Sequence, residues 1–199
     1  MFSDIALKLA QEKQKKIYKK LYSEHKESHR SLHWSTPENQ RKRFDVLMGI
    51  GELEGKKILD IGCGMGDFFG HLQAAGIRAD ITGYDIVEEF LHIARRRYPR
   101  GTFKPINLSR SSTHEKFDYV FSSGLFAFGN MTFFETMVKK AYTSSRIGYG
   151  FNIYHSREDE RFMNISRRQI ERFLKRLAPS KIICHEGYLE NDTTFFVYR

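Results

Sequence analysis

The sequence predicts an α/β fold built on an open, mostly parallel β-sheet, and three observations carry this prediction. From residue 56 onward, short apolar runs of strand length alternate with longer segments of helical periodicity. The first run ends in three glycines at alternating positions, which is typical of a strand, a tight turn and a helix start. The last two runs, 181–185 and 193–198, are joined by a loop too short for a crossover helix, so they must pair antiparallel.

Composition fits one domain with a substantial core. The chain has 199 residues, of which 40% are hydrophobic and 29% charged. No apolar run approaches the ~18–20 residues that a membrane span needs, and the start of the chain lacks a secretory pattern. Cys63 and Cys184 make neither a disulfide framework nor a zinc site. We therefore expect a cytoplasmic protein without a membrane partner, and we leave its oligomeric state open.

The net charge of +9 allows three interpretations. It is compatible with a solvated basic surface, with an acidic small substrate, or with a nucleic-acid partner. The lysines at 13–20 flank a weak apolar stripe, which favours a solvated helix face over a membrane anchor. The run 95–97 of arginines falls at a predicted helix end, where cations suit the helix dipole.

An N-terminal helical extension, residues 1–54, precedes the main domain of residues 55–199. It is predicted to contain a helix over 3–22, a polar loop over 23–35, and a second helix that ends near Gly49. Thr36 and Pro37 have the residue types of an N-cap and a first-turn proline. The sole tryptophan, Trp34, lies in the loop, either as a packing anchor or over a cofactor or cationic substrate.

The glycine turn of residues 62–66 follows the first strand, which carries Asp60. Glycine tolerates positive φ and lets a ligand approach the backbone closely, and the amides of the next helix start face that ligand. The spacing is G-x-G-x-G rather than the dinucleotide pattern G-x-G-x-x-G, and Asp67 stands where the third dinucleotide glycine would be. An anion there disfavours a pyrophosphate and tolerates an ammonium or sulfonium.

Asp60-x-Gly62-x-Gly64-x-Gly66 resembles the glycine motif of class I S-adenosylmethionine-dependent methyltransferases. The resemblance covers about residues 53–199. It implies a three-layer α/β/α sandwich whose seven strands have the order 3-2-1-4-5-7-6, with strand 7 antiparallel. It further implies S-adenosylmethionine as cofactor, S-adenosylhomocysteine as product, and an N-terminal extension that caps the cofactor cleft.

The ends of the next strands supply the remaining cofactor candidates. Strand 81–86 carries Asp85, 19 positions beyond Gly66, where a carboxylate can accept both ribose hydroxyls. This acid alone does not separate NAD from S-adenosylmethionine. After helix 87–97 and strand 102–106, the resemblance implies that Asn107 contacts the adenine amino group. Strand 117–121 leads to two serines. The predicted cofactor residues are Asp60, Gly62, Cys63, Gly64, Gly66, Asp85, Ile86, Asn107, Leu108, Ser122, Ser123 and Trp34.

A helix over 131–144, a strand over 147–154 and a helix beginning at Ser166 complete the alternation before the terminal hairpin. His155, at the carboxyl end of the fifth strand, is the first candidate for a general base, assisted by Tyr154, because histidine titrates near neutral pH. An exposed loop histidine is the alternative. His33 and His71 are weaker candidates.

The acceptor signatures of several methyltransferase classes are missing. No Asn/Asp-Pro-Pro-Tyr/Phe follows strand four, no cysteine has a Pro-Cys context, and no metal-ligand constellation stands out. The apolar segment 125–128 suits a closed pocket for a small acceptor. Three functions remain: O- or N-methylation of a small molecule by in-line transfer, methylation of RNA or protein through the basic surface, and an inactive cofactor-binding scaffold.

Overall fold

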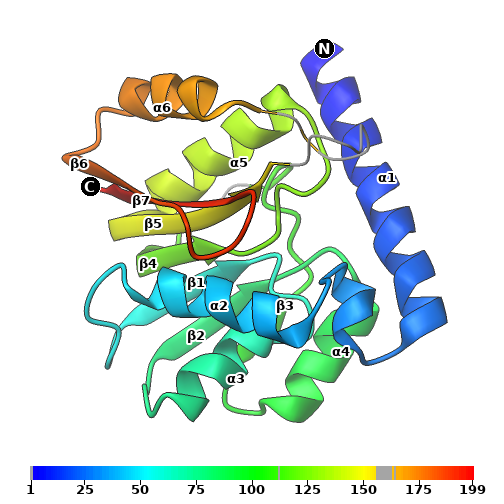
Figure 1. The fold of residues 1–199 in the computed structure, drawn as a ribbon. Helices are drawn as coiled ribbons and strands as arrows, with labels where there is room; N and C mark the ends of the chain where they lie inside the picture. Colours follow the sequence, from blue (N-terminus) through cyan, green and yellow to red (C-terminus); the bar gives the residue numbers. More distant parts are fainter. Residues whose placement is uncertain (1, 112, 156–162, 164) are drawn as a thin grey trace.

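The computed structural model of this protein describes residues 2–111, 113–155, 163 and 165–199 (Figure 1). Its described residues form one seven-stranded sheet with the order β3-β2-β1-β4-β5-β7-β6, which confirms the predicted order. The strands are β1 (Lys57–Ile61), β2 (Asp80–Tyr84), β3 (Thr102–Lys104), β4 (Phe117–Ser122), β5 (Ser145–Tyr154), β6 (Lys181–His185) and β7 (Asp192–Tyr198).

The first five strands run parallel to their neighbours, and β7 runs antiparallel to both β5 and β6. Parallel strands are covered on both faces, so their sequences are continuously apolar rather than alternating. In β1, four of the five residues are buried. The carboxyl ends of the parallel strands meet at one edge of the sheet, where α/β proteins bind ligands.

Helices cover both faces of the sheet (Figure 1). One face carries α2 (Pro37–Met48), α3 (Asp67–Ala74) and α4 (Glu88–Arg97), and the other carries α5 (Met131–Ser144) and α6 (Arg167–Arg176). Each face has its own apolar core, rich in phenylalanine. The structure therefore has the three layers that the sequence predicts.

Several helix starts use the capping chemistry visible in the sequence. The Thr36 side chain accepts a hydrogen bond from the Asn39 amide, with Pro37 in the first turn. Ser166 and Gln169 form a reciprocal capping box at the start of α6. The predicted polar loop 23–35 is wrong in part. Helix α1 (Phe2–His25) continues to His25, and a 3-10 helix, η1 (His29–Leu32), follows it.

Helix α1 stands across the carboxyl edge of the sheet (Figure 1) and packs against η1 and α5. It is joined to this edge by hydrogen bonds from Gln11 to Asn107 and from Gln14 to the Phe128 carbonyl. In the described part of the chain, no helix is both long and apolar enough to cross a membrane. The N-terminal extension thus reaches the place where the sheet positions its ligand-binding residues.

The centre of β2 has no room for a side chain, because a Cβ at Gly83 would lie 2.7 Å from Cys63 Sγ and 2.7 Å from Phe103 Cδ1. We expect Gly83→Ala to lower the free energy of unfolding by about 1–3 kcal/mol, as overpacked cores do. Urea denaturation measures the change. Gly150→Ala is the matched control, since its nearest contact would be 3.1 Å, to Phe121. Equal losses in the two variants would contradict this packing.

Candidate active site

The glycine turn lies between β1 and α3, where the chain reverses direction. Gly62, Gly64 and Gly66 all have positive φ, at +75°, +52° and +80°, which explains glycine at these positions. The Gly62 and Cys63 amides both donate to the Tyr84 carbonyl, at 2.7 and 3.1 Å. The turn is therefore tied to the end of β2, beside Asp85.

Asp85 is the central anion of the site. Its Oδ2 accepts the Gly64 amide at 2.9 Å, and its Oδ1 accepts the Val87 amide at 2.9 Å. Burial raises the pKa of this carboxyl, while backbone hydrogen bonds from Val87, Gly64 and Ile86 act in the opposite direction. Each oxygen keeps a further lone pair for a ligand hydroxyl.

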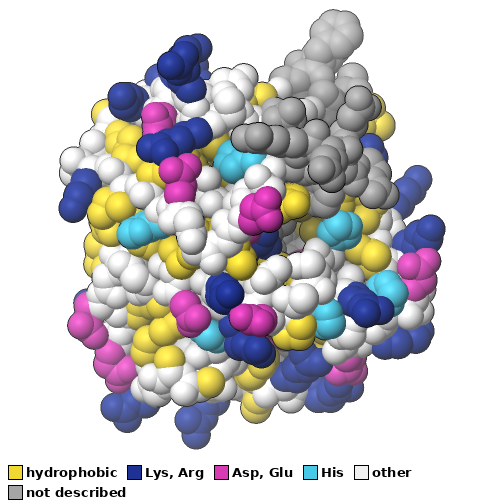
Figure 2. Space-filling model, viewed as in Figure 1, with side chains coloured by type: hydrophobic (Ala, Val, Ile, Leu, Met, Phe, Trp, Pro, Cys, Tyr) yellow, Lys and Arg dark blue, Asp and Glu magenta, His cyan; other side chains and the backbone are white. Residues whose placement is uncertain are grey.

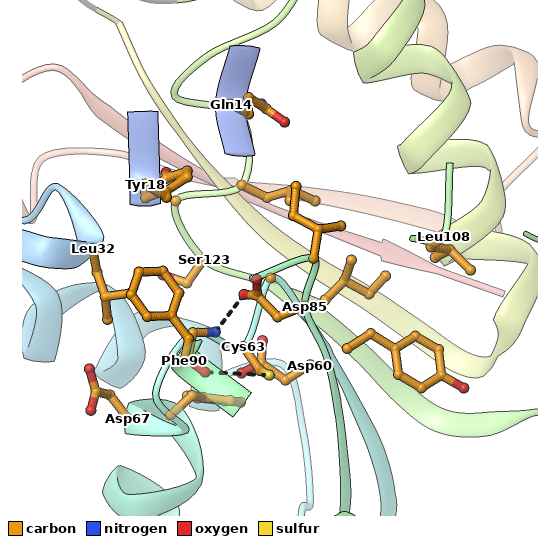
Figure 3. A pocket seen from close by; sticks show the side chains of 18 of the residues that line it. Gln14, Tyr18, Leu32, Asp60, Cys63, Asp67, Asp85, Phe90, Leu108 and Ser123 are labelled. Carbon is orange, nitrogen blue, oxygen red and sulfur yellow. Dashed lines mark hydrogen bonds between the residues drawn. The ribbon is translucent and has the colours of Figure 1, made fainter. Parts of the chain in front are cut away.

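Two more carboxyl groups, Asp60 and Asp67, line the same cavity (Figure 3). Asp67 accepts from Gln40 at 2.9 Å and from Arg97 at 3.3 Å. Asp60 is 5% exposed and has no side-chain hydrogen bond among the described residues. Burial, with smaller contributions from Asp85 and Asp67, raises the pKa of Asp60 to about 8.

Asn107 and Leu108 follow β3 and lie on the far side of this cavity. The Lys140 ammonium donates to the carbonyls of Leu108, Ser109 and Ser111, each at 2.8 Å, and so fixes their turn. The Asn107 amide forms a reciprocal pair with Gln11, at 2.8 and 2.9 Å, and its oxygen also accepts from Ser109 at 2.9 Å. A base amino group would have to exchange with one of these donors at the Asn107 oxygen.

The structure brings most of the predicted cofactor residues to this one cavity, which we call the first pocket. The predicted residues that line it are Trp34, Asp60, Gly62, Cys63, Gly64, Asp85, Ile86, Asn107, Leu108 and Ser123. Two of them lie outside its lining. Gly66 packs against Tyr98, to which a Cβ would come within 2.8 Å. Ser122 is buried and hydrogen-bonded to the Tyr149 hydroxyl at 2.6 Å.

Sequence reasoning missed the residues that α1 contributes. Gln11, Gln14 and Tyr18 all line the first pocket, and Gln14 and Tyr18 lie over Asp85 in Figure 3. Burial, with the nearby Asp85 carboxylate, raises the pKa of the Tyr18 hydroxyl. These residues are spaced three and four apart, so they share one helix face. This stripe of residues with polar groups on a predicted helix is the sequence feature that could have indicated their position in the site.

A second pocket of about 620 Å³ adjoins the first and shares Tyr18, Leu32, Trp34 and Gly124 with it. Trp34 is 8% exposed and lines both pockets. It is therefore a packed residue, and its predicted contact with a cofactor or cationic substrate stays a prediction.

Of the two predicted catalytic residues, one lines a pocket and the other does not. Tyr154 lines the second pocket. His155 lines neither pocket, and its Nε2 lies 3.1 Å from Thr193 Oγ1. Of the weaker candidates, His33 lines the second pocket. The His71 ring pairs with Asp45 at 2.7 Å on the surface of α3. In the described residues, no cluster of three or more His, Cys, Asp or Glu could hold a metal ion.

The donor set of the first pocket fits a nucleoside that carries a positive charge. Asp85 can accept ribose hydroxyls, Asn107 can pair with a base edge, and the Asp67 carboxylate favours a cation, which would also favour ionisation of Asp60. Three carboxyl groups in one buried cavity are unfavourable for a pyrophosphate. The chemistry of these residues thus fits S-adenosylmethionine and not a dinucleotide.

We expect the burial of Asp60 to make the stability of the protein depend on pH. Its folded pKa, about 8, lies above the unfolded value of 3.8. Between these values only the folded state holds the proton, so stability falls as pH rises from about 4 to about 8 and then levels. Asp60→Asn should therefore be more stable than the parent at pH 9 by at least about 2 kcal/mol, and should lose that advantage at pH 4.

Thermal denaturation at pH 4 and pH 9 measures the difference, with Asp80→Asn, an exposed residue at the start of β2, as the matched control. A pH-independent effect of Asp60→Asn would show that this carboxyl is ionised in the folded protein.

Comparison with known sequences gives partial matches. A family model described as "Methyltransferase domain" matches residues 58–148. Trans-aconitate 2-methyltransferase of Afipia carboxidovorans is 34% identical over 89 residues, 45% of this chain and 35% of that protein. Ubiquinone biosynthesis O-methyltransferase of Bordetella avium is 35% identical over 71 residues, 31% of this chain and 29% of that protein. The chain thus spans about a third of the length of these curated relatives.

Solved structures match over nearly the whole chain. A complex of DhpI with S-adenosylhomocysteine has a TM-score of 0.71 and 17% identity, and the match covers 94% of this chain and 95% of that one. Magnesium protoporphyrin IX methyltransferase of Synechocystis, with bound S-adenosylhomocysteine, has a TM-score of 0.68 and 15% identity, with 92% and 93% coverage. At this identity the structural matches establish the fold.

The family prediction made from the glycine motif is confirmed by the domain match, which spans β1, the glycine turn and Asp85, and by the strand order of the sheet. The chain thus contains a match to a methyltransferase domain over residues 58–148, and its sheet has the strand order of the class I S-adenosylmethionine-dependent methyltransferase fold.

Proposed function

We propose that this chain transfers a methyl group from S-adenosylmethionine to a small-molecule acceptor. In this proposal the first pocket binds the cofactor and the second pocket binds the acceptor. The observation that carries it is the wall that the two pockets share, formed by Tyr18, Leu32, Trp34 and Gly124. Transfer by in-line displacement needs two ligands aligned on either side of one junction, with water excluded.

S-adenosylmethionine supplies an electrophilic methyl carbon on a positively charged sulfur. The residues of this chain then have binding and orienting roles. Asp85 would accept the ribose hydroxyls, Asn107 and Leu108 would contact the base, and Asp67 would attract the positive end, whose charge would in turn favour ionisation of Asp60. As the methyl carbon bonds to the acceptor, the carbon–sulfur bond breaks and its electron pair stays on sulfur. A proton on the acceptor atom leaves to solvent or to a base.

We propose that Tyr154 and His155 both serve the acceptor, Tyr154 by direct contact and His155 indirectly. Tyr154 lines the second pocket and can position an acceptor directly. His155 is hydrogen-bonded to Thr193 and touches neither pocket, so it acts on the reaction only through the end of β5. Asn152, within β5, accepts a hydrogen bond from the Gly124 amide at 3.0 Å and so fixes one residue of the shared wall.

A small molecule is favoured over RNA or protein by the distribution of charge. On the face shown in Figure 2, lysines and arginines are interspersed with acidic side chains. The arginine run at the end of α4 is engaged, since Arg95 pairs with Glu88 and Arg96 with Glu27. The two curated relatives are also named for small-molecule substrates. We propose a cytoplasmic enzyme on the same grounds of composition as before.

Labelled methyl transfer tests this function directly. Purified protein with S-adenosylmethionine labelled in the methyl group is given a cell extract divided into small-molecule, RNA and protein fractions. We expect label in the small-molecule fraction, and loss of that label in Asp85→Ala. Calorimetry should show that this variant binds S-adenosylhomocysteine about 2–3 kcal/mol more weakly, because hydrogen bonds to a charged acceptor are worth ~1.5–3 kcal/mol each. Tighter binding of NAD than of S-adenosylhomocysteine would refute the cofactor assignment.

We also propose that residues 1–54 act as a cap on the domain of residues 55–199, since α1 and Trp34 line the first pocket. Trp34 fluorescence should then shift when S-adenosylhomocysteine is added, because the ligand changes the surroundings of the indole. Hydrogen exchange should slow over residues 11–34 on binding. Trp34→Phe is the spectroscopic control. If neither signal responds to a ligand that calorimetry shows to bind, the extension is packing alone.

A further inference from the structure

The second pocket has one basic wall. Its residues come from the end of α1, from η1, from α2, from the end of β5 and from the loop before β7. Three of them, His25, Arg30 and His33, lie within nine positions of each other on the α1–η1 side. Arg30 is exposed to the pocket, and among the described residues no acidic side chain pairs with its guanidinium. A cation without a partner attracts an anionic ligand.

Arg43 of α2 also lines the second pocket, next to the aromatic residues Trp34 and Tyr154. Its Nε donates to Asp192 at 2.6 Å, and its Nη2 also pairs with Asp192. Its guanidinium carbon lies 4.6 Å from the Trp34 ring and 5.9 Å from the Tyr154 ring. The pair neutralises Asp192, and it leaves Glu190, which also lines the pocket, as its exposed acid.

This stacking decides against a positively charged acceptor. A cationic ligand binds well on the open face of an aromatic ring, but Arg43 already lies over both Trp34 and Tyr154. A second cation would therefore compete with this guanidinium for the same two rings. An anion, in contrast, would find guanidinium nitrogens available to it. Among the described residues, no acidic side chain pairs with Arg30, and the third nitrogen of Arg43, Nη1, has no hydrogen-bond partner.

We propose that the second pocket binds an acceptor that carries an oxyanion, a carboxylate or a phosphate, and that Arg30 is the residue that holds this anion. The inference rests on the proposed function, because it names the chemical class of the acceptor for the same transfer. Arg43, next to Trp34 in the wall shared with the first pocket, helps to orient the acceptor.

Methyl transfer from separated pools tests the class of acceptor. The small-molecule fraction of an extract is divided by ion exchange into anionic, neutral and cationic pools, and each receives the enzyme and labelled S-adenosylmethionine. Label from the anionic pool is expected. Phosphatase treatment of that pool beforehand distinguishes the sources, because it abolishes labelling of a phosphate and spares a carboxylate. Label mainly from the neutral or cationic pool, or from none, would overturn the proposal.

The role of Arg30 is tested with the acceptor pool that accepts the label. Arg30→Ala should raise the KM for the acceptor about tenfold or more, with the dissociation constant of S-adenosylhomocysteine unchanged, and Arg30→Lys should recover part of the loss. Arg41→Ala is the matched control, an exposed arginine of α2 that lines neither pocket. An unchanged KM in Arg30→Ala removes this residue from the site. Failure of the parent protein to bind S-adenosylhomocysteine would instead refute the proposed function itself.

Discussion

A buried carboxylate at the end of β2 organises the site. Asp85 is held by backbone amides from two different elements, Gly64 in the glycine turn and Val87 before α4. A buried anion with no cation beside it is stable only when donors surround it, so these amides must stay where they are. The same bonds hold the glycine turn against the end of β2, and they leave one side of the carboxylate open to the first pocket.

The two pockets differ in electrostatic character, although they share a wall. The first contains three carboxyl groups, of which Asp60 has no hydrogen-bond partner among the described residues. The second has Arg30 and two histidines on one side. In the proposed reaction this difference sorts the ligands, because a sulfonium is attracted to the first pocket and an oxyanion to the second.

Most of the sheet and half of the site are properties of local sequence. The glycine turn and the caps at Thr36 and Ser166 depend on residues within a few positions of one another, and they lie where the sequence predicts them. The strand ends differ by up to two residues, as in β3, which ends at Lys104 and not at 106. Asp85 and Asn107 were placed at strand ends, and parallel strands bring their ends to one edge of the sheet. The part that was missed comes from α1. Gln11 meets Asn107, 96 positions away, and no spacing rule specifies such a contact.

The sequence by itself determined the strand–turn–helix unit around the glycine motif and the antiparallel terminal strand pair, because each depends on short-range patterns that backbone geometry requires. The resemblance carried by that motif implied the strand order and the cofactor. Only the tertiary structure decided how the N-terminal extension is used. It placed Gln11, Gln14 and Tyr18 over the first pocket and Trp34 between the two pockets. It also turned the ring of His155 toward Thr193 and put Arg43 over Trp34. These positions result from packing between distant segments, where the orientation of a side chain depends on its three-dimensional neighbours and not on the adjacent sequence.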